Sequence, residues 1–411
     1  MEKKLARILV LVCMAVLITV SSVLTGCGGS SGGNHVVVIG FLGDQTGPSA
    51  AAFQSILTSL NDYLTVMEKE NPIPGVTLKI ATYDTRYEYA RIPMGYEYLK
   101  EQGMVLLLQY MGDQQPITLP NQKEDGVPSY AFAEKKGLEN EPLVFCWEPE
   151  YYWEGRGTMD YIVSTWDAAL GRPLKVGHLA MANYATDQQQ NAGMAAVAAE
   201  NPSKVILTTV QGDPTQTSWA SEVNDLRNCD FIVTSSVGPA TPTFLNEVRA
   251  RGFTGKIIGL TQSVLGYWSE IKTAVPANYL DGLMAIHFYL HWTDNSEYIS
   301  QMKANVAKYF PDRAEQLEQG TAWLTQQVTA QILTDAVRRA AAKVGPAKVD
   351  GAAIRDALEA TDINIPGMGE SISCHNGTHV MYRMYRMIKY DAGKDDWSAI
   401  TDWALPSGLA G

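Results

Sequence analysis

The sequence predicts an α/β protein with parallel sheets. From residue 35 onward, short β-rich runs alternate with longer stretches of helical pattern, as in folds whose parallel strands are joined by crossover helices. The first run, VVVI at 36–39, is continuously apolar, which is typical of a strand buried on both faces. A length of 411 residues favours two domains over one.

The expected elements follow one another in a regular order. The strand at 36–39 leads through the turn GDQTGP at 43–48 into a helix over 51–70. Further strands are expected at 76–80, 104–108, 127–132 and 143–145, and then at 175–179, 204–209, 231–234, 256–258 and 282–290. The remaining elements are a long helix over 321–343 and strands near 372 and at 382–389.

The N-terminus predicts an export signal. Basic residues precede an apolar stretch over 8–20, which is shorter than the roughly 20 residues that a transmembrane helix needs. The segment LTGC at 24–27 resembles the lipobox of bacterial lipoproteins. This resemblance implies that residues 1–26 are a lipoprotein signal peptide and that Cys27 carries a lipid. Residues 27–34 would then be a flexible linker holding an extracytoplasmic protein to the bacterial membrane. An ordinary secretory signal is the alternative.

Composition and motifs exclude several functions. The formal net charge is -12 and the chain has no basic run, so nucleic acid is not an expected partner. Besides Cys27, the exported chain keeps Cys146, Cys229 and Cys374, which allow at most one internal disulfide. No Cys/His ligand spacing and no motif of a catalytic triad, zinc protease or phosphate-binding loop occurs. We therefore expect no metal, no cofactor and no enzymatic activity.

Four segments resemble a known family. They are IGFLGDQTGP at 39–48, KEDGVP at 123–128, VGHL at 176–179, and RGF followed by GKIIG at 251–259. In this order and spacing they resemble type I periplasmic substrate-binding proteins of the leucine-binding group, which serves ABC importers of branched-chain amino acids and related solutes. The resemblance spans nearly all of the chain after the signal.

The resemblance implies two Rossmann-like lobes joined by a three-segment hinge. Lobe 1 would hold residues 35–147 and 283–370, and lobe 2 residues 148–282 and 371–411. The chain would cross between the lobes near 147–150, 279–283 and 370–374. A small molecule would bind in the cleft, and closure would present the protein to an ABC permease. A sensor that presents its closed form to a membrane receptor is the alternative.

The expected ligand site lies at the strand ends that face the cleft. Free backbone amides in the loop from Thr46 to Phe53 are expected to hold an anionic group. The three consecutive aromatic side chains at 151–153 cannot all face one core, so at least one of these rings is expected in the cleft. The candidate residues are Thr46, Phe53, Met111, Gly112, Asp113, Ala133 and Glu134 in lobe 1, and Tyr151, Tyr152, Trp153, Tyr184 and Gln262 in lobe 2.

The candidate site departs from the amino-acid-binding pattern of the family. The loop at 110–115 lacks the serines that would take a carboxylate, and Asp113 would repel one unless it caps the following helix. Gln262 stands where an acid would hold an ammonium group, and no acid aligns convincingly near 151–153. We therefore expect a ligand without a strict α-amino acid head group, such as an aromatic or polar small organic molecule.

Overall fold

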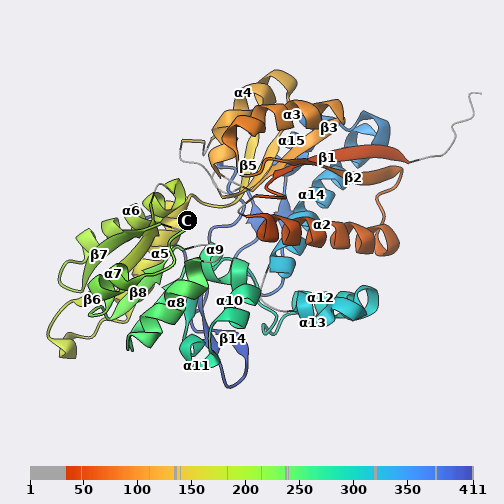
Figure 1. The fold of residues 1–411 in the computed structure, drawn as a ribbon. Helices are drawn as coiled ribbons and strands as arrows, with labels where there is room; N and C mark the ends of the chain where they lie inside the picture. Colours follow the sequence, from red (N-terminus) through yellow and green to blue (C-terminus); the bar gives the residue numbers. More distant parts are fainter. Residues whose placement is uncertain are drawn as a thin grey trace, which may run out of the picture.

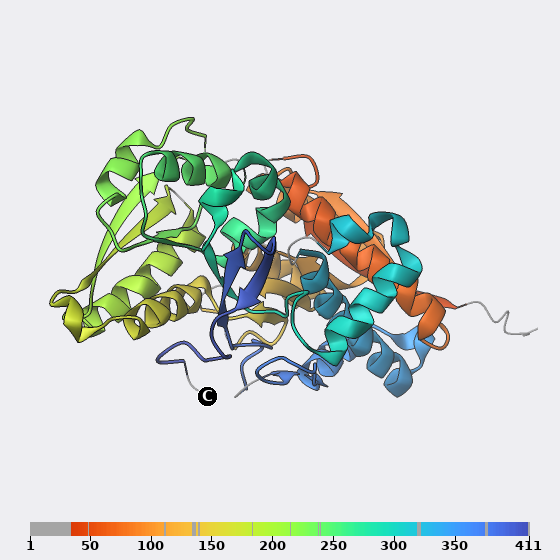
Figure 2. The ribbon, with the colours of Figure 1, turned by 90° about the horizontal axis from the view of Figure 1, so that it is seen from below.

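The computed structural model describes residues 34–409, except for 48, 111, 134–136, 139, 183, 214, 237, 239, 319–321 and 375–376. The predicted signal peptide, the linker and Cys27 lie outside these residues. Figures 1 and 2 show two bodies side by side, with C-terminal segments running between them. We call the body around the smaller sheet lobe 1 and the body around the larger sheet lobe 2.

Lobe 1 is built on a five-stranded parallel sheet with the order β2-β1-β3-β4-β5. Its strands are β1 (His35–Gly43), β2 (Val76–Asp84), β3 (Met104–Gln109), β4 (Ser129–Ala133) and β5 (Val144–Glu148). All residues of β1 from Val37 to Gly43 are buried, because helices cover both faces of the sheet.

Lobe 2 is built on a seven-stranded sheet with the order β14-β13-β10-β9-β8-β6-β7. Its parallel strands are β6 (Leu174–Met181), β7 (Val205–Gly212), β8 (Phe231–Thr234), β9 (Lys256–Gly259) and β10 (Met284–His287). The antiparallel strands β13 (Arg386–Asp391) and β14 (Asp396–Ala399) extend this sheet beside β10. A separate short pair joins β11 (Asp362–Ile363) to β12 (Ile372–Ser373).

The helices follow the chain in two groups. Those of lobe 1 are α2 (Ala50–Glu70), α3 (Ile92–Glu101), α4 (Gln115–Asp125), α12 (Glu297–Tyr309), α13 (Ala314–Leu317), α14 (Ala322–Val344) and α15 (Gly351–Glu359). Those of lobe 2 are α5 (Tyr151–Ser164), α6 (Ala185–Glu200), α7 (Ala220–Leu226), α8 (Ala240–Ala250), α9 (Thr261–Val264), α10 (Trp268–Ala274) and α11 (Ala277–Leu280). Side-chain caps start some of them: Ser296 accepts from the amide of Ile299, and Asp350 from that of Ala353. Among the described helices, none has the length and apolar character needed to cross a membrane.

The chain passes between the lobes three times. The first crossing follows β5 at 149–150, because α5 packs on α6 of lobe 2. The second lies beyond the predicted 279–283, because β10 pairs with β9 and β13 and so belongs to the larger sheet. The third lies beyond the predicted 370–374. There the amides of Met381 and Tyr382 donate to the carbonyls of Cys146 and Trp147, at 2.9 and 2.8 Å, before β13 begins.

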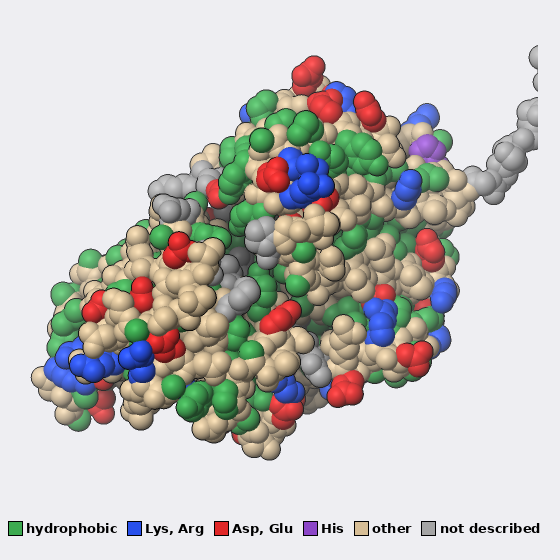
Figure 3. All heavy atoms as spheres, in the orientation of Figure 1, with side chains coloured by type: hydrophobic (Ala, Val, Ile, Leu, Met, Phe, Trp, Pro, Cys, Tyr) green, Lys and Arg blue, Asp and Glu red, His purple; other side chains and the backbone are tan. Residues whose placement is uncertain are grey.

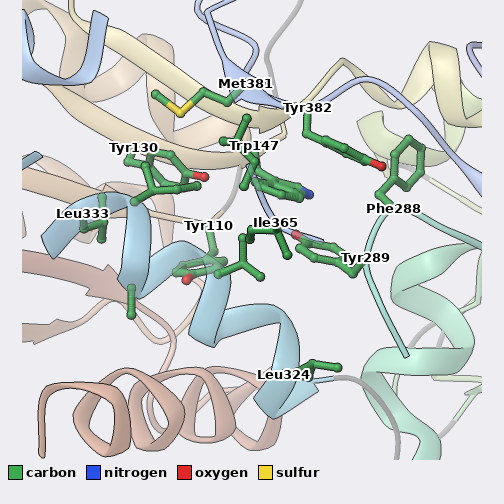
Figure 4. Packing of buried hydrophobic residues seen from close by; sticks show 14 of the residues in the cluster. Tyr110, Tyr130, Trp147, Phe288, Tyr289, Leu324, Leu333, Ile365, Met381 and Tyr382 are labelled. Atoms are coloured by element: carbon green, nitrogen blue, oxygen red, sulfur yellow. The ribbon is translucent and has the colours of Figure 1, made fainter. Parts of the chain in front are cut away.

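Three aromatic rings, one beside each crossing, form what we call the hinge stack. The Trp147 indole lies between the rings of Tyr289 and Tyr382, with ring centroids 4.8 and 5.1 Å away and interplanar angles of 11° and 15°. Figure 4 shows the indole between the two phenol rings. Trp403 meets Tyr382 edge-on at 5.8 Å. The hinge is therefore a packed part of the core rather than three loose connections.

Candidate functional site

The carboxyl ends of the strands meet where the two lobes face each other. Figure 3 shows a furrow along this boundary. Phe132 of lobe 1 stacks on Tyr289 of the second crossing at 6.0 Å. At the rim, Tyr267 of lobe 2 lies close to Ser49, which follows β1 in lobe 1 and lowers the pKa of the Tyr267 phenol against the effect of burial. The lobes are thus in contact, and the strand ends lie between them.

The rim on the lobe 1 side carries a strained turn after β2. Arg86 and Tyr87 have φ values of 52° and 61°, which cost roughly 1–3 kcal/mol each in residues other than glycine. Burial raises the pKa of Tyr87, and the nearby phenols of Tyr184 and Tyr267 raise it further. Tyr184, a predicted site residue, therefore faces this turn from lobe 2. Strain of this kind is found at functional loops that the surrounding structure holds in place.

Two aspartates hold the loops after β1 and β2. Asp44 accepts from the amides of Gly47 at 2.5 Å and Ser49 at 2.7 Å. Asp84 accepts from the amide of Gln45 at 2.8 Å and from the hydroxyl of Thr46 at 2.6 Å. Burial alone would raise the pKa of Asp84, but these hydrogen bonds lower it overall. The protein's own carboxylates therefore occupy the amides of Gln45, Gly47 and Ser49, and an anion held by the other amides of this loop stays a prediction.

The other predicted residues of lobe 1 are mostly structural. Phe53 is buried in an aromatic cluster with Phe41 and Tyr110, at ring distances of 6.2 and 6.3 Å. Gly112 is buried, and half-buried Asp113 accepts from the hydroxyl of Tyr89 at 3.4 Å. Ala133 is buried at the end of β4, and Met111 and Glu134 lie outside the described residues.

The predicted residues of lobe 2 divide between the cleft and the body of the lobe. Tyr151 is buried and lies close enough to Tyr289 to raise the pKa of its phenol. Tyr152 contacts Trp153 edge-on at 5.1 Å and accepts from Arg156 at 3.4 Å. Tyr151 is thus the member of the aromatic cluster that is nearest to the lobe boundary. The side chain of Gln262, on α9, lies outside the described part of the chain.

Three buried carboxyl groups lie close together, Glu154 between Glu148 at the end of β5 and Asp187 on α6. Glu154 accepts from the amide of Thr261 at 2.8 Å and from the side-chain amide of Gln190 at 2.5 Å. Asp187 accepts from the amide of Met181 at 2.5 Å. Burial raises the pKa of all three carboxyls, that of Asp187 to about 7.

Glu148 differs from the other two acids because its Oε2 is buried and accepts no hydrogen bond from any described residue. Sequence reasoning missed Glu148, and it also missed Tyr87, Tyr267 and Tyr289. The one usable signal was a charged residue ending the otherwise apolar segment VFCWE, directly before the first crossing. Among the described residues, no disulfide joins Cys146, Cys229 or Cys374, and no group of three or more His, Cys, Asp or Glu side chains is placed to hold a metal ion.

Comparison with known proteins identifies the family. The sequence profile of the periplasmic binding protein family matches residues 36–395, so the chain belongs to this family. No curated protein matches significantly. Among solved structures, a branched-chain amino acid ABC transporter protein from Thermus thermophilus with bound valine has 15% identity and a TM-score of 0.76, covering 91% of this chain and 98% of that one.

Two further structures show the range of ligands in similar folds. A solute-binding protein from R. palustris in complex with benzoate has 15% identity and a TM-score of 0.73, covering 90% of this chain and 97% of that one. A fatty acid ABC transporter substrate-binding protein from Thermomonospora curvata has 14% identity and a TM-score of 0.74, covering 91% and 95%. The predicted α/β fold of a type I periplasmic binding protein is therefore confirmed.

Proposed function

We propose that this protein is an extracytoplasmic solute-binding protein that captures a small organic ligand between its lobes and delivers it to an ABC importer. The observation that carries the proposal is the hinge of three crossings between two lobes whose strand ends face each other. Proteins of the same fold hold valine and benzoate, and another serves fatty acid transport. No catalytic constellation is part of the proposal.

The mechanism that this architecture supports is a shift between open and closed populations. A ligand that touches both lobes stabilises the closed state in proportion to the contacts that only this state makes. Tyr267 of lobe 2 lies close to Ser49 of lobe 1, as a pair that closure would bring together. An importer that recognises the closed form would then receive loaded protein in preference to empty protein.

We further propose that Cys27 carries a lipid that holds the protein to the outer side of the bacterial membrane, with residues 27–34 as linker. Lobe 1 would comprise residues 35–148 and 288–382, and lobe 2 residues 149–287 and 383–409, boundaries that the strand pairing of β5, β10 and β13 supports. A ligand sensor uses the same cleft and remains the second candidate. Uptake of ligand by vesicles containing the permease and its ATPase separates transport from sensing.

Thermal unfolding against a ligand panel tests the binding role. The protein would begin at residue 28, which keeps every described element, and the panel would hold amino acids, aromatic acids, amides, amines and polyols. A ligand at about 100 times its dissociation constant raises the free energy of unfolding by about 2.7 kcal/mol. A shift with one chemical class supports the proposal and names the class, whereas the absence of any shift contradicts it.

A further inference from the structure

We propose that Glu148 binds the cationic group of an organic amine, and that the cleft selects amines without an adjacent carboxylate. This inference rests on the proposed function, because it names the ligand class of the same cleft. It is carried by the position, burial and lack of partners of one carboxyl group, and by the groups around it.

Glu148 occupies the place where a ligand would touch lobe 1. It is the last residue of β5, at the carboxyl edge of the smaller sheet and directly before the first crossing. In the sheet it is paired with Ala133, the last residue of β4. Its side chain is only 2% exposed. The carboxyl group therefore lies at the boundary between the lobes and away from bulk water.

The carboxyl group of Glu148 lacks the partners that the other buried acids have. No described residue donates a hydrogen bond to its buried Oε2, and no Lys, Arg or His side chain of the described residues forms an ion pair with it. A buried charge without a partner is strongly disfavoured, so the group is either protonated or paired with a cation. Burial raises its pKa well above the usual range, and the carboxyl of Glu154 raises it further. Burial without a partner therefore favours the protonated carboxyl, and a bound cation would replace that proton.

Aromatic groups complete the site. Tyr289 of the second crossing is 1% exposed, and its buried hydroxyl also has no hydrogen-bond partner among the described residues. Burial raises the pKa of this phenol, and Glu148 is the charged group that raises it most. An ammonium group has several N–H donors, so it can satisfy a carboxylate and a phenol oxygen together, and an aromatic face adds a cation–π attraction.

The same cleft offers little to a carboxylate. The amides after β1 are occupied by Asp44 and Asp84, and the N-terminal amide of α9 is occupied by Glu154. The net charge of -12 also attracts cations and repels anions. An amine without a neighbouring carboxylate therefore finds hydrogen-bond acceptors and negative charge, whereas the carboxylate of an α-amino acid would be repelled.

Binding of a protonated amine would release a proton. The Glu148 carboxylic acid loses its proton to solvent, and the resulting carboxylate pairs with the ammonium of the ligand, so charge and atoms balance. The carboxyl of Glu154 from α5 and the phenol of Tyr289 are the titratable groups that act on Glu148. Around Tyr289 lie the phenols of Tyr110, Tyr130 and Tyr151, the ring of His287 at 5.8 Å and the buried Arg386, which donates to the Tyr289 carbonyl and is paired with Asp294. Amine affinity should therefore fall as the pH is lowered.

Isothermal titration calorimetry with matched probes tests the inference. The probes form two sets, each with one carbon skeleton. The aliphatic set is 3-methylbutylamine, L-leucine and 4-methylpentanoate. The aromatic set is 2-phenylethylamine, L-phenylalanine and 3-phenylpropanoate. We expect the amines to bind, the carboxylates not to bind and the amino acids to bind more weakly than the amines. Titration in buffers of different ionisation enthalpy should show release of about one proton per amine.

Variants assign the effect to Glu148. Glu148→Gln keeps the shape but removes the charge, and it should weaken amine binding by roughly 30-fold or more, as for other buried charge pairs. Glu124→Gln removes a charge from an exposed position on α4 and should leave affinity unchanged. Far-UV circular dichroism confirms folding, and proton release by the unmodified protein tests the site without any variant.

The outcomes separate this inference from the proposed function. Tight binding of a carboxylate or neutral ligand that Glu148→Gln does not weaken would overturn the cation site and leave a solute-binding protein. Amine binding without proton release and unchanged in Glu148→Gln would overturn it equally. Absence of binding by every amine overturns the inference, and absence of binding by every class in the wider panel overturns the proposed function as well.

Discussion

Replacing Trp147 by Leu should weaken the whole fold, because this indole joins all three crossings. The side chain is fully buried and stacks on Tyr289 and Tyr382 at 4.8 and 5.1 Å. Each aromatic pair contributes about 0.5–1.5 kcal/mol beyond burial, so two pairs contribute about 1–3 kcal/mol. The smaller side chain also leaves a cavity, so we expect the free energy of unfolding to fall by roughly 3–4 kcal/mol in total, within the range for truncation of a buried tryptophan.

Urea unfolding followed by far-UV circular dichroism measures this loss. Trp153→Leu is the matched control, because that indole is half-buried and makes one edge contact, with Tyr152. We expect the free energy of unfolding of this control to fall by less than about 1 kcal/mol. A double-mutant cycle with Tyr382→Leu should give a coupling energy of about 0.5–1.5 kcal/mol with Trp147. Equal losses for Trp147→Leu and Trp153→Leu, or zero coupling, would refute the stack as the element that joins the crossings.

Three further predictions concern the loops and lobe 2. Asp84→Asn should lower the free energy of unfolding by about 1–2 kcal/mol through weaker hydrogen bonds to the loop after β1, and unchanged urea midpoints would contradict this. Gly193→Ala should lower the free energy of unfolding in urea by about 1–3 kcal/mol, because the new Cβ would lie 1.9 Å from the Tyr152 carbonyl oxygen. In the control Gly266→Ala, the new Cβ has no atom within 4 Å, so the free energy of unfolding should not change. Asp187 has a folded pKa of about 7 against an ordinary value of 3.8, so the folded state binds more protons than the unfolded state between these values. The free energy of unfolding should therefore fall as pH rises from about 4 to 7, at up to about 1.4 kcal/mol per pH unit, and Asp187→Asn should flatten this slope in urea titrations at several pH values.

The fold was predictable where the pattern is local. The apolar run at 36–39 and the helical period over 51–70 correspond to β1 and α2. A buried strand appears as a continuous apolar run and a covering helix as a periodic one, so both can be recognised within a short stretch of sequence. The second and third crossings were misplaced for a different reason. Whether 284–287 joins one sheet or the other depends on pairing with β13, about 100 residues further along the chain. No local signal encodes that pairing.

The candidate site was predictable at the level of loops but not of contacts. Strand ends indicated which loops lie at the lobe boundary, and ligands in parallel sheets bind at that edge. The turn GDQTGP looked like a source of free amides, yet Asp44 folds back onto Gly47 and Ser49. Glu148 was overlooked because a single acid after an apolar strand also reads as an ordinary exposed strand end. Its burial follows only from the approach of the second lobe.

Tyr289 links the hinge to the proposed cation site, and its two functions can be separated by substitution. Its ring belongs to the hinge stack, whereas its buried hydroxyl has no hydrogen-bond partner in the described part of the chain and is influenced by the charge of Glu148. Tyr289→Phe keeps the ring and removes a polar group whose burial is uncompensated, so the free energy of unfolding should stay level or rise by about 1 kcal/mol. The same variant should weaken amine binding, because one acceptor for the ammonium group is lost. Tyr289→Leu should reduce both properties.

Urea unfolding and amine titration of the two Tyr289 variants measure the separation. If Tyr289→Phe lowers the free energy of unfolding as much as Tyr289→Leu, the hydroxyl stabilises the fold and is not a ligand contact. If both variants keep full amine affinity, the phenol is no part of the site. The expected pattern, with stability retained and affinity lost in Tyr289→Phe alone, would mean that the ligand contacts the same residue that holds the three crossings together. Ligand capture and lobe closure would then act through one side chain.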